Sequence, residues 1–285
     1  MLMAKLYQYN DLVADGKLIK RPSKIVKSPY IADIFIEDNE HLAHAPSLGM
    51  SGLLNENSEF LCSKTDDPKR KSKYTVELIY LPSTKDTYCL TNTNPQFGNY
   101  LFRQIVENNI IDKYKNHTFF KSEKTYNNSR FDFYIEKENG RKEFIEIKSV
   151  VLCDFEKDNH PTNIEYWKKN DCGPEISILE SDDYKKAAIF PDGFRKNKNV
   201  PISERAIKHL NELADCIKDD YDATIYFVVQ RNDCHYFKPS RKDKFYYDAI
   251  KKAQENGVNI QAISVVWNAD GSCYFDRFLP VVIKK

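Results

Sequence analysis

Two acidic residues and a lysine on two strand-like segments have the types and spacing needed to hold a divalent metal ion. The segment 129–133 carries Asp132, and the segment 145–148 carries Glu146 and Lys148. Because side chains alternate along a strand, Glu146 and Lys148 should share one face of a sheet. Carboxylate oxygens are the ligands that Mg²⁺ prefers, and a bound Mg²⁺ or Mn²⁺ can activate water and neutralise charge that develops on a phosphate. The set therefore predicts hydrolysis of phosphodiester bonds, with Asp132 and Glu146 as metal ligands and Lys148 beside the attacking water.

The loop between the two segments decides whether the acids can meet. A two-residue turn at Asn139-Gly140 would place Asp132 opposite Ile147 and turn Glu146 to the other face. A three-residue loop over 138–140 would instead place Asp132 opposite Glu146. Such loops usually have a glycine in the left-handed region at the third position, which is where Gly140 lies. We therefore predict the three-residue loop, or an equivalent bulge.

An ordinary strand with charged residues on its surface is the alternative interpretation of the same segments. An acid and a base two positions apart are expected by chance roughly six times in a chain of this composition. The flanking residues Ile145 and Ile147 favour the metal site, because carboxylates are rarely placed among apolar neighbours without a partner. The segment 145–148 leaves both interpretations open.

Two kinds of pattern surround these segments and indicate the elements that position them. Up to about residue 90, short apolar runs alternate with turn residues, which is typical of a small β-barrel or sandwich. Beyond Asn92-Thr93, helical and strand-like patterns alternate, which indicates an α/β layer domain. Three helices are predicted: one over 99–112, one that follows Ser203 as its N-cap, and one over 244–256. Strands are predicted over 130–136, 143–151, 223–229 and 258–267. The polar stretch 154–186 is interpreted as an insertion in this second domain.

Composition and charge exclude several classes of protein. The chain has 285 residues, and 43 Lys and Arg against 42 Asp and Glu give a formal charge of +1, which excludes a uniformly basic nucleic-acid coat but not a local basic channel. With 41% hydrophobic residues the chain is not mostly disordered. The apolar run 223–229 is too short to span a membrane, and no secretory segment follows Met1, so we expect a cytoplasmic protein. Seven cysteines without a Cys-x-x-Cys spacing give little support for disulfides or a thiolate zinc site.

Clusters of basic residues are candidates for contacts with nucleic acid. Single clusters of this kind are often solvated loops. Two of them within one predicted small barrel favour contacts with the phosphate backbone instead, with DNA as the first candidate partner and RNA as the second. The candidate residues are Lys20, Arg21, Lys69, Arg70, Lys71, Lys73 and, beside the predicted metal site, Arg130.

Stretches spread over most of the chain resemble one known family, in the order in which that family carries them. They are Gly16-Lys17-Leu18-Ile19-Lys20-Arg21, Lys69-Arg70-Lys71, Asn92-Thr93, Ser129-Arg130-Phe131-Asp132-Phe133, Ile145-Glu146-Ile147-Lys148-Ser149-Val150, Phe190-Pro191-Asp192, Lys208-His209-Leu210 and Phe237-Lys238-Pro239. On these residues the chain resembles the sugar fermentation stimulation protein family, whose second domain belongs to the PD-(D/E)xK nuclease superfamily.

The resemblance implies an OB-like barrel over 1–85, followed by a restriction-endonuclease-like α/β core over 86–285. It implies nucleic-acid binding, with Asp132 and Glu146 as metal ligands and Lys148 as the catalytic lysine. Gln104 lies where the family usually has a glutamate in the first helix of the nuclease core, and is the candidate auxiliary ligand. Because an amide adds no charge, the resemblance leaves a second possibility open: a DNA-binding regulator of sugar-utilisation genes that keeps the nuclease fold without catalysis.

Overall fold

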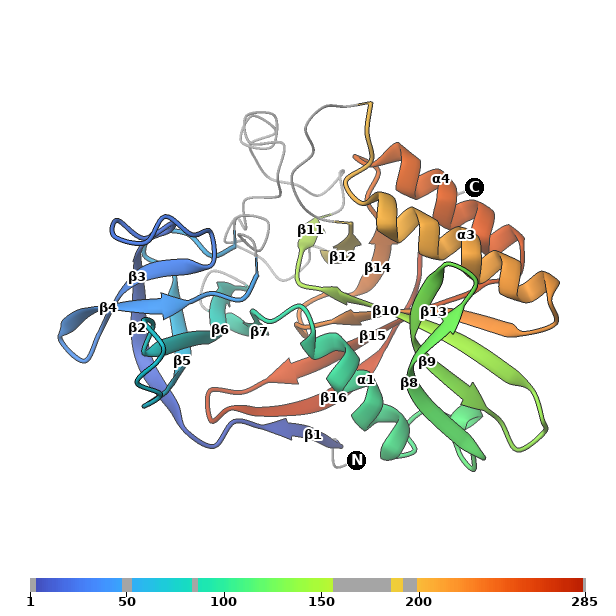
Figure 1. Cartoon of the computed structure of the whole chain (residues 1–285), viewed down its shortest axis with the longest axis horizontal. Coiled ribbons are helices and arrows are strands. Elements are labelled where there is room, and N and C mark those ends of the chain that lie inside the picture. Colours follow the sequence, from blue (N-terminus) through green and yellow to red (C-terminus); the bar gives the residue numbers. More distant parts are fainter. Residues whose placement is uncertain (1–3, 48–52, 84–86, 156–185, 192–198, 284–285) are drawn as a thin grey trace.

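The computed structural model of the chain describes residues 4–47, 53–83, 87–155, 186–191 and 199–283. Most of the predicted insertion lies outside these ranges. The described strands form two large sheets and one small sheet, with helices on both faces of the larger one (Figure 1). No helix in the described ranges is both long and apolar enough to cross a bilayer.

The first large sheet closes into a small barrel, as the sequence predicts. Its strands follow the order β4-β3-β2-β5-β6-β7, and a parallel pairing of β4 with β6 closes five of them into a ring. Gly16 leaves room for the Phe60 ring in the core of the barrel, because a Cβ at this position would overlap that ring. The strands are β2 (Leu12–Lys20), β3 (Ile31–Ile36), β4 (Asn39–His44), β5 (Glu59–Lys64), β6 (Tyr74–Pro82) and β7 (Tyr88–Asn92).

The second large sheet has seven strands in the order β1-β16-β15-β13-β10-β9-β8. The central strands β10, β13 and β15 are parallel, and the remaining pairings are antiparallel. The strands are β1 (Lys5–Gln8), β8 (Phe119–Tyr126), β9 (Ser129–Glu136), β10 (Lys142–Val150), β13 (Asp222–Val229), β15 (Asn259–Trp267) and β16 (Ser272–Leu279); a small sheet joins β11 (Cys153–Phe155), β12 (Lys186–Phe190) and β14 (Tyr236–Pro239).

Three helices cover this sheet. Helix α1 (Phe97–Glu107) packs on one face, and helices α3 (Glu204–Lys218) and α4 (Lys244–Glu255) pack together on the other, so that a separate apolar core lies on each face. Ser203 caps α3 as predicted, because its side chain accepts a hydrogen bond from the Ala206 amide at 3.2 Å. Helix α1 is shorter than predicted: it ends at Glu107, and Asn109 turns the chain with φ at +54°. A 3-10 turn, η2 (Asp112–Tyr114), follows.

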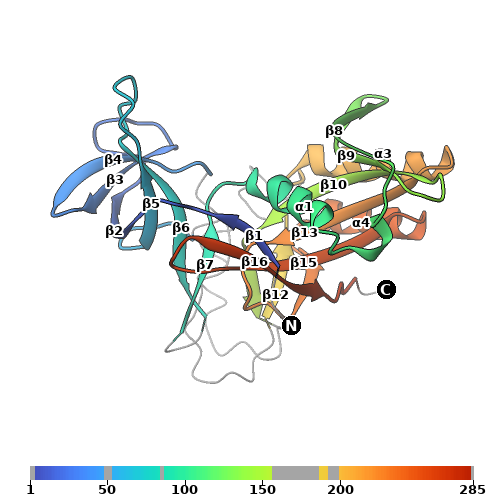
Figure 2. The same ribbon diagram turned by 90° about the horizontal axis from the view of Figure 1, so that it is seen from below.

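The two sheets do not divide the chain at residue 85. Strand β1 pairs with β16, with Lys5 opposite Tyr274, so the first strand belongs to the second sheet (Figure 2). Strand β7, which begins at Tyr88, extends the barrel sheet instead. The predicted boundaries 1–85 and 86–285 therefore differ from the sheets at both ends, because strand pairing is a long-range property that local patterns do not report.

Candidate active site

The hairpin of β9 and β10 has the predicted register. Phe144 lies opposite Tyr134, and Ile145 lies opposite Phe133. In the loop, the Lys137 amide donates to the Arg141 carbonyl oxygen at 2.9 Å, and Gly140 has φ at +79°. The three-residue loop over 138–140 is thus confirmed, and its register would place Asp132 opposite Glu146 if the pairing continued by one residue.

Followed away from the loop, the regular pairing of β9 with β10 ends at Phe133 and Ile145, so Asp132 is the first residue of β9 beyond the paired part. The Ile147 amide, which would otherwise bond across the ladder, donates to Oδ2 of Asp132 at 2.8 Å. Phe131 packs in the core under α3, whereas Phe133 packs in the core under α1. Regular strand alternation would put residues 131 and 133 on one face of the sheet, so the alternation is interrupted at Asp132. Glu123, opposite on β8, is likewise irregular, with φ at +58°.

Helix α1 holds the other oxygen of Asp132. Nδ2 of Asn99 donates to Oδ1 of Asp132 at 2.7 Å. Burial and, second, the neighbouring carboxylate of Glu146 raise the pKa of Asp132 to about 6, although the bond from Ile147 and the charge of Lys148 act in the opposite direction. Asp132 is thus an acid whose negative charge is incompletely balanced by its surroundings.

Glu146 lies on the α3 side of the sheet and is only 2% exposed. Its Oε1 accepts from Nζ of Lys148 at 2.5 Å and is hydrogen-bonded with Nδ1 of His209 on α3. Burial opposes ionisation of Glu146, but these two partners outweigh it and lower the pKa of the carboxyl below its ordinary value. The result is a buried, ionised carboxylate with a cation and an imidazole on one oxygen.

The second oxygen of Glu146 gives the test for a metal ligand. Oε2 is buried and has no hydrogen-bond partner in the described part of the chain. An orphaned carboxylate oxygen of this kind is costly unless a ligand or ion satisfies it. Asp132 is bound to the amide of Ile147, the residue between Glu146 and Lys148. Asp132 on β9 and Glu146 on β10 are near enough for the charge of Glu146 to raise the pKa of Asp132. Two neighbouring carboxylates, one with a free oxygen, fit a hard divalent cation such as Mg²⁺ or Mn²⁺.

Gln104 does not take the predicted place in this site. Its Nε2 donates to Glu107 at 2.9 Å, toward the solvent side of α1. The helix residue that bonds to Asp132 is Asn99, which lies five positions earlier and hence about 140° around the helix. Local patterns offer no way to choose between the two, because the rotation of α1 is set by its packing on the sheet.

His209 is the functional candidate that reasoning from charge patterns missed. It is 4% exposed and is hydrogen-bonded with Glu146. Its ring makes an edge-to-face contact with the ring of Phe131, with 6.0 Å between the ring centroids. The segment Lys208-His209-Leu210 is among the stretches that carry the family resemblance. That stretch is therefore the feature of the sequence from which His209 could have been chosen as a candidate.

Comparisons with known proteins identify the family. A family model described as "SfsA N-terminal OB domain" matches residues 30–89, and one described as "Sugar fermentation stimulation protein RE domain" matches residues 96–161 and 178–271. The chain is 32% identical to a sugar fermentation stimulation protein homolog of Clostridium beijerinckii, over 92% of this chain and 94% of that protein. A homolog of Pelagibacter ubique is 31% identical over 90% of each chain.

The chain belongs to the sugar fermentation stimulation protein family. The resemblance inferred from the sequence is thereby confirmed. The fold agrees as well: the structure of Pyrococcus furiosus SfsA in complex with Ca²⁺ matches with a TM-score of 0.70, over 98% of this chain and 99% of that one, at 20% identity. An N-terminal OB barrel followed by an α/β core is thus the fold of this SfsA family member.

The predicted basic residues of the barrel have different surroundings. Lys20, Lys69, Lys71 and Lys73 are exposed, and Arg70 is exposed with a weak hydrogen bond to Thr75. Arg70 and Lys71 line a pocket of about 310 Å³ on the barrel. These five side chains are placed to meet solvent or a ligand.

Arg21 differs from this group. Its Nε donates to the Pro29 carbonyl oxygen at 2.7 Å, and a terminal nitrogen bonds to the carbonyl oxygens of Ala45 and Ser47. The guanidinium therefore ties two loops of the barrel together. Arg130, by contrast, is exposed, forms an ion pair with Glu123 at 3.4 Å and lines a second pocket together with His209.

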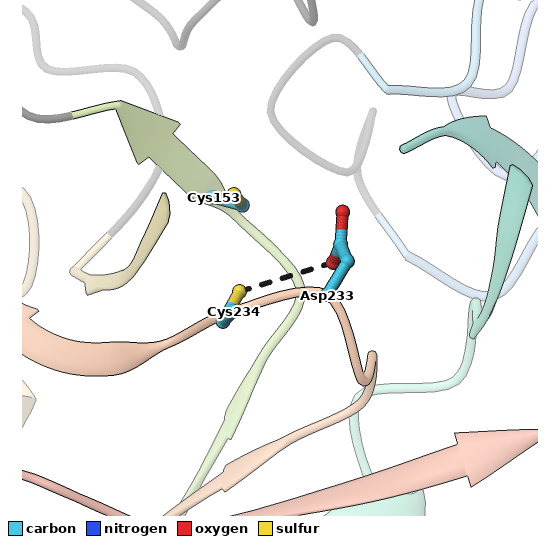
Figure 3. Close-up of side chains that lie close together, drawn as sticks. All are labelled: Cys153, Asp233 and Cys234. Carbon is cyan, nitrogen blue, oxygen red and sulfur yellow. Dashed lines mark hydrogen bonds between the residues drawn. The ribbon is translucent and has the colours of Figure 1, made fainter. Parts of the chain in front are cut away.

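Cys153, Asp233 and Cys234 form a second cluster of possible metal ligands among the described residues (Figure 3). Both oxygens of Asp233 already bind cations, because the fully buried Arg231 donates at 2.6 and 2.7 Å and Lys186 at 3.0 Å. Burial raises the pKa of the Cys234 thiol well above its ordinary value, which disfavours the thiolate that a metal requires. We assign this cluster a structural role.

Proposed function

We propose that this protein binds nucleic acid and cleaves it as a metal-dependent nuclease of the PD-(D/E)xK type. The observation that carries the proposal is the set on β9 and β10: Asp132 at the Ile147 amide, Glu146 with a buried unpartnered oxygen, and Lys148 on the same strand. DNA is the first candidate substrate and RNA the second. A cytoplasmic location would suit either substrate.

Asp132 and Glu146 are the residues that would hold Mg²⁺ or Mn²⁺. The related Pyrococcus furiosus SfsA was solved in complex with Ca²⁺, which supports a cation site in the family. When bound, such an ion supplies an activated water and neutralises charge on the phosphate. The repulsion between Asp132 and Glu146 and the orphaned oxygen of Glu146 are both relieved by a divalent cation.

The remaining residues orient these two acids. Asn99 and the Ile147 amide each bond one oxygen of Asp132, so the carboxylate cannot rotate freely. Lys148 and His209 hold one oxygen of Glu146 and leave the other free. Lys148 places an ammonium group beside the acids, where it can favour negative charge on an attacking water or a phosphate.

The experiment that tests the proposal is cleavage of circular single-stranded DNA, circular double-stranded DNA and a labelled RNA. Each substrate is incubated with Mg²⁺, with Mn²⁺ and with EDTA. We expect metal-dependent cutting by the wild-type protein, and loss of cutting in Asp132→Ala and Lys148→Ala. Lys142→Ala, which removes an exposed lysine from the same strand, is the matched control and should cut normally. Opening of the circles would identify an endonuclease.

A second candidate function is a DNA-binding regulator of sugar-utilisation genes without catalysis. It is favoured by one observation: helix α1 contributes the neutral amide of Asn99 to Asp132, and not a carboxylate. This function predicts salt-sensitive DNA binding that neither metal nor Lys148→Ala alters. Binding without cutting in every metal condition would favour it over the nuclease.

A further inference from the structure

A pocket of about 530 Å³ opens on the α3 side of the candidate active site. Its walls come from the turn between β8 and β9 and from the first turns of α3, two segments that lie side by side (Figure 1). His209 belongs both to the lining of the pocket and to the contacts of Glu146. The pocket is therefore separated from the proposed metal ligand by one side chain.

The charged residues of the lining are mostly cationic. Arg130, Arg205 and Lys208 are cations on this lining, and Glu204 is the acidic residue among the lining residues. The partners of these cations leave donors free: Arg130 pairs with the exposed Glu123 at 3.4 Å. Lys208 donates to a backbone carbonyl at 2.7 Å and forms a long ion pair with Glu212 at 3.8 Å. A chain with a formal charge of only +1 thus concentrates positive charge at this place.

A buried hydroxyl group supplies an independent sign of a missing ligand. Ser129 lines the pocket, is 4% exposed, and its Oγ has no hydrogen-bond partner within the described ranges. A buried hydroxyl without a partner costs free energy, and an acceptor oxygen in the pocket would satisfy it. Three cations and one free donor match the oxygens of a phosphate group.

We propose that this pocket binds a phosphate of the nucleic-acid strand adjacent to the phosphate at the metal site, with Arg130, Arg205 and Lys208 as its contacts. The identity of the ligand rests on the proposed nuclease function. Contacts of this kind fix the register of a strand and carry no base information. The pocket would thus position the strand so that one phosphodiester bond lies at Asp132 and Glu146.

The test measures binding in EDTA, so that no cleavage is needed. The double variant Arg205→Gln/Lys208→Gln is compared with Lys218→Gln, which removes an exposed lysine at the far end of the same helix. Probes are a labelled linear single-stranded DNA with a 5′-phosphate, the same strand with a 5′-hydroxyl, and a small single-stranded circle. Loss of two phosphate contacts should lower the slope of log K against log salt by about 1.4 and weaken binding roughly tenfold near physiological salt.

The outcomes distinguish an internal phosphate, a terminal phosphate and the absence of a phosphate contact at this pocket. Equal weakening on circle and linear strands identifies an internal phosphate, and weakening confined to the 5′-phosphorylated strand identifies a terminal phosphate in the same pocket. A slope and an affinity that equal those of Lys218→Gln on every probe would overturn the proposal. Ser129→Ala provides a second reading: it should keep the melting temperature and still weaken binding, whereas unchanged binding contradicts the role of the hydroxyl.

Failure of the nuclease function is distinguishable from failure of this inference. A wild-type protein that binds strands through the pocket but never cuts them contradicts the nuclease and leaves the phosphate site standing. Conversely, metal-dependent cutting whose substrate affinity is unaffected by the double variant supports the nuclease and excludes this phosphate site.

Discussion

The carboxylate of Asp132 accepts a hydrogen bond from the backbone amide of Ile147, with 2.8 Å between Oδ2 and the nitrogen. That amide lies between Glu146 and Lys148 in the chain, so the bond brings the acid of one strand to the acid and base of the next. The Asp132 side chain here takes the place of a backbone acceptor on β9, which is why the regular pairing of β9 with β10 ends at this level. The strands thus provide the opening in which two carboxylates can face one cation.

Glu146→Gln should abolish metal binding. The change keeps the shape of the side chain but removes the charge on the oxygen that has no partner among the described residues. Ca²⁺ at about a hundred times its Kd should stabilise the wild-type protein by about 2.7 kcal/mol, and thermal unfolding should show no such gain in the variant. Glu138→Gln, in the exposed hairpin loop, is the control and should respond to Ca²⁺ like the wild type. A Ca²⁺ response preserved in Glu146→Gln would place the ion elsewhere.

His209→Ala should weaken metal binding by roughly 10- to 100-fold, because the imidazole orients the carboxylate of Glu146 without itself binding the ion. His209→Gln, which keeps a hydrogen-bonding group, should recover part of the affinity. Calorimetric titration with Mn²⁺ below the melting temperature of each variant measures both values. A purely structural histidine would lower the melting temperature and leave the Mn²⁺ affinity of the folded protein unchanged.

Asn99→Ala should weaken metal binding, since it frees one oxygen of Asp132 from its position. Gln104→Ala should leave the affinity within about twofold, because Gln104 is half-buried and bonds to Glu107, away from Asp132. The same Mn²⁺ titration compares the two variants on one helix. The opposite order of effects would restore the residue that the family resemblance points to.

Lys71→Gln and Arg21→Gln should separate a ligand contact from a structural one on the barrel. Lys71 is exposed at a pocket, so its loss should lower the salt slope of DNA binding by roughly 0.7–0.9 with little change in stability. Arg21 bonds to the backbone carbonyls of Pro29 and Ala45, so its loss should chiefly lower the melting temperature. Binding and thermal unfolding, measured on both variants, would contradict this division if Lys71→Gln lost stability and kept its salt slope.

Asp233→Asn should destabilise the protein by about 3–5 kcal/mol, because it leaves the fully buried Arg231 without its counter-ion. Burial opposes ionisation of Asp233, but Arg231 and Lys186 hold its pKa well below the ordinary value of 3.8. A lowered pKa adds stability that is present above 3.8 and is lost as the pH falls through the folded-state value. Denaturant unfolding should therefore show a smaller loss of stability below about pH 4 in the variant than in the wild type. Asp215→Asn, at an exposed ion pair, should change little.

Several features of the site follow from the sequence alone. Gly140 at the third loop position fixes the register of the hairpin, because a left-handed residue there strongly favours a three-residue loop. That register and strand alternation on β10 predict Asp132 near Glu146 and Lys148, and the Ile147 amide that binds Asp132 lies between those two residues. The barrel and the α/β core are likewise predictable, since they depend on local hydrophobic periodicity and on turn residues.

The partners of these residues were decided by tertiary structure. The rotation of α1 on the sheet selects Asn99 over Gln104, and the crossing of α3 brings His209 to Glu146 from 63 positions away. The same holds for Arg21, whose guanidinium donates to the carbonyl oxygens of two loops. Sequence patterns report which face of an element is buried, but which side chain meets which is set by the packing of several elements at once, and no local pattern encodes that contact.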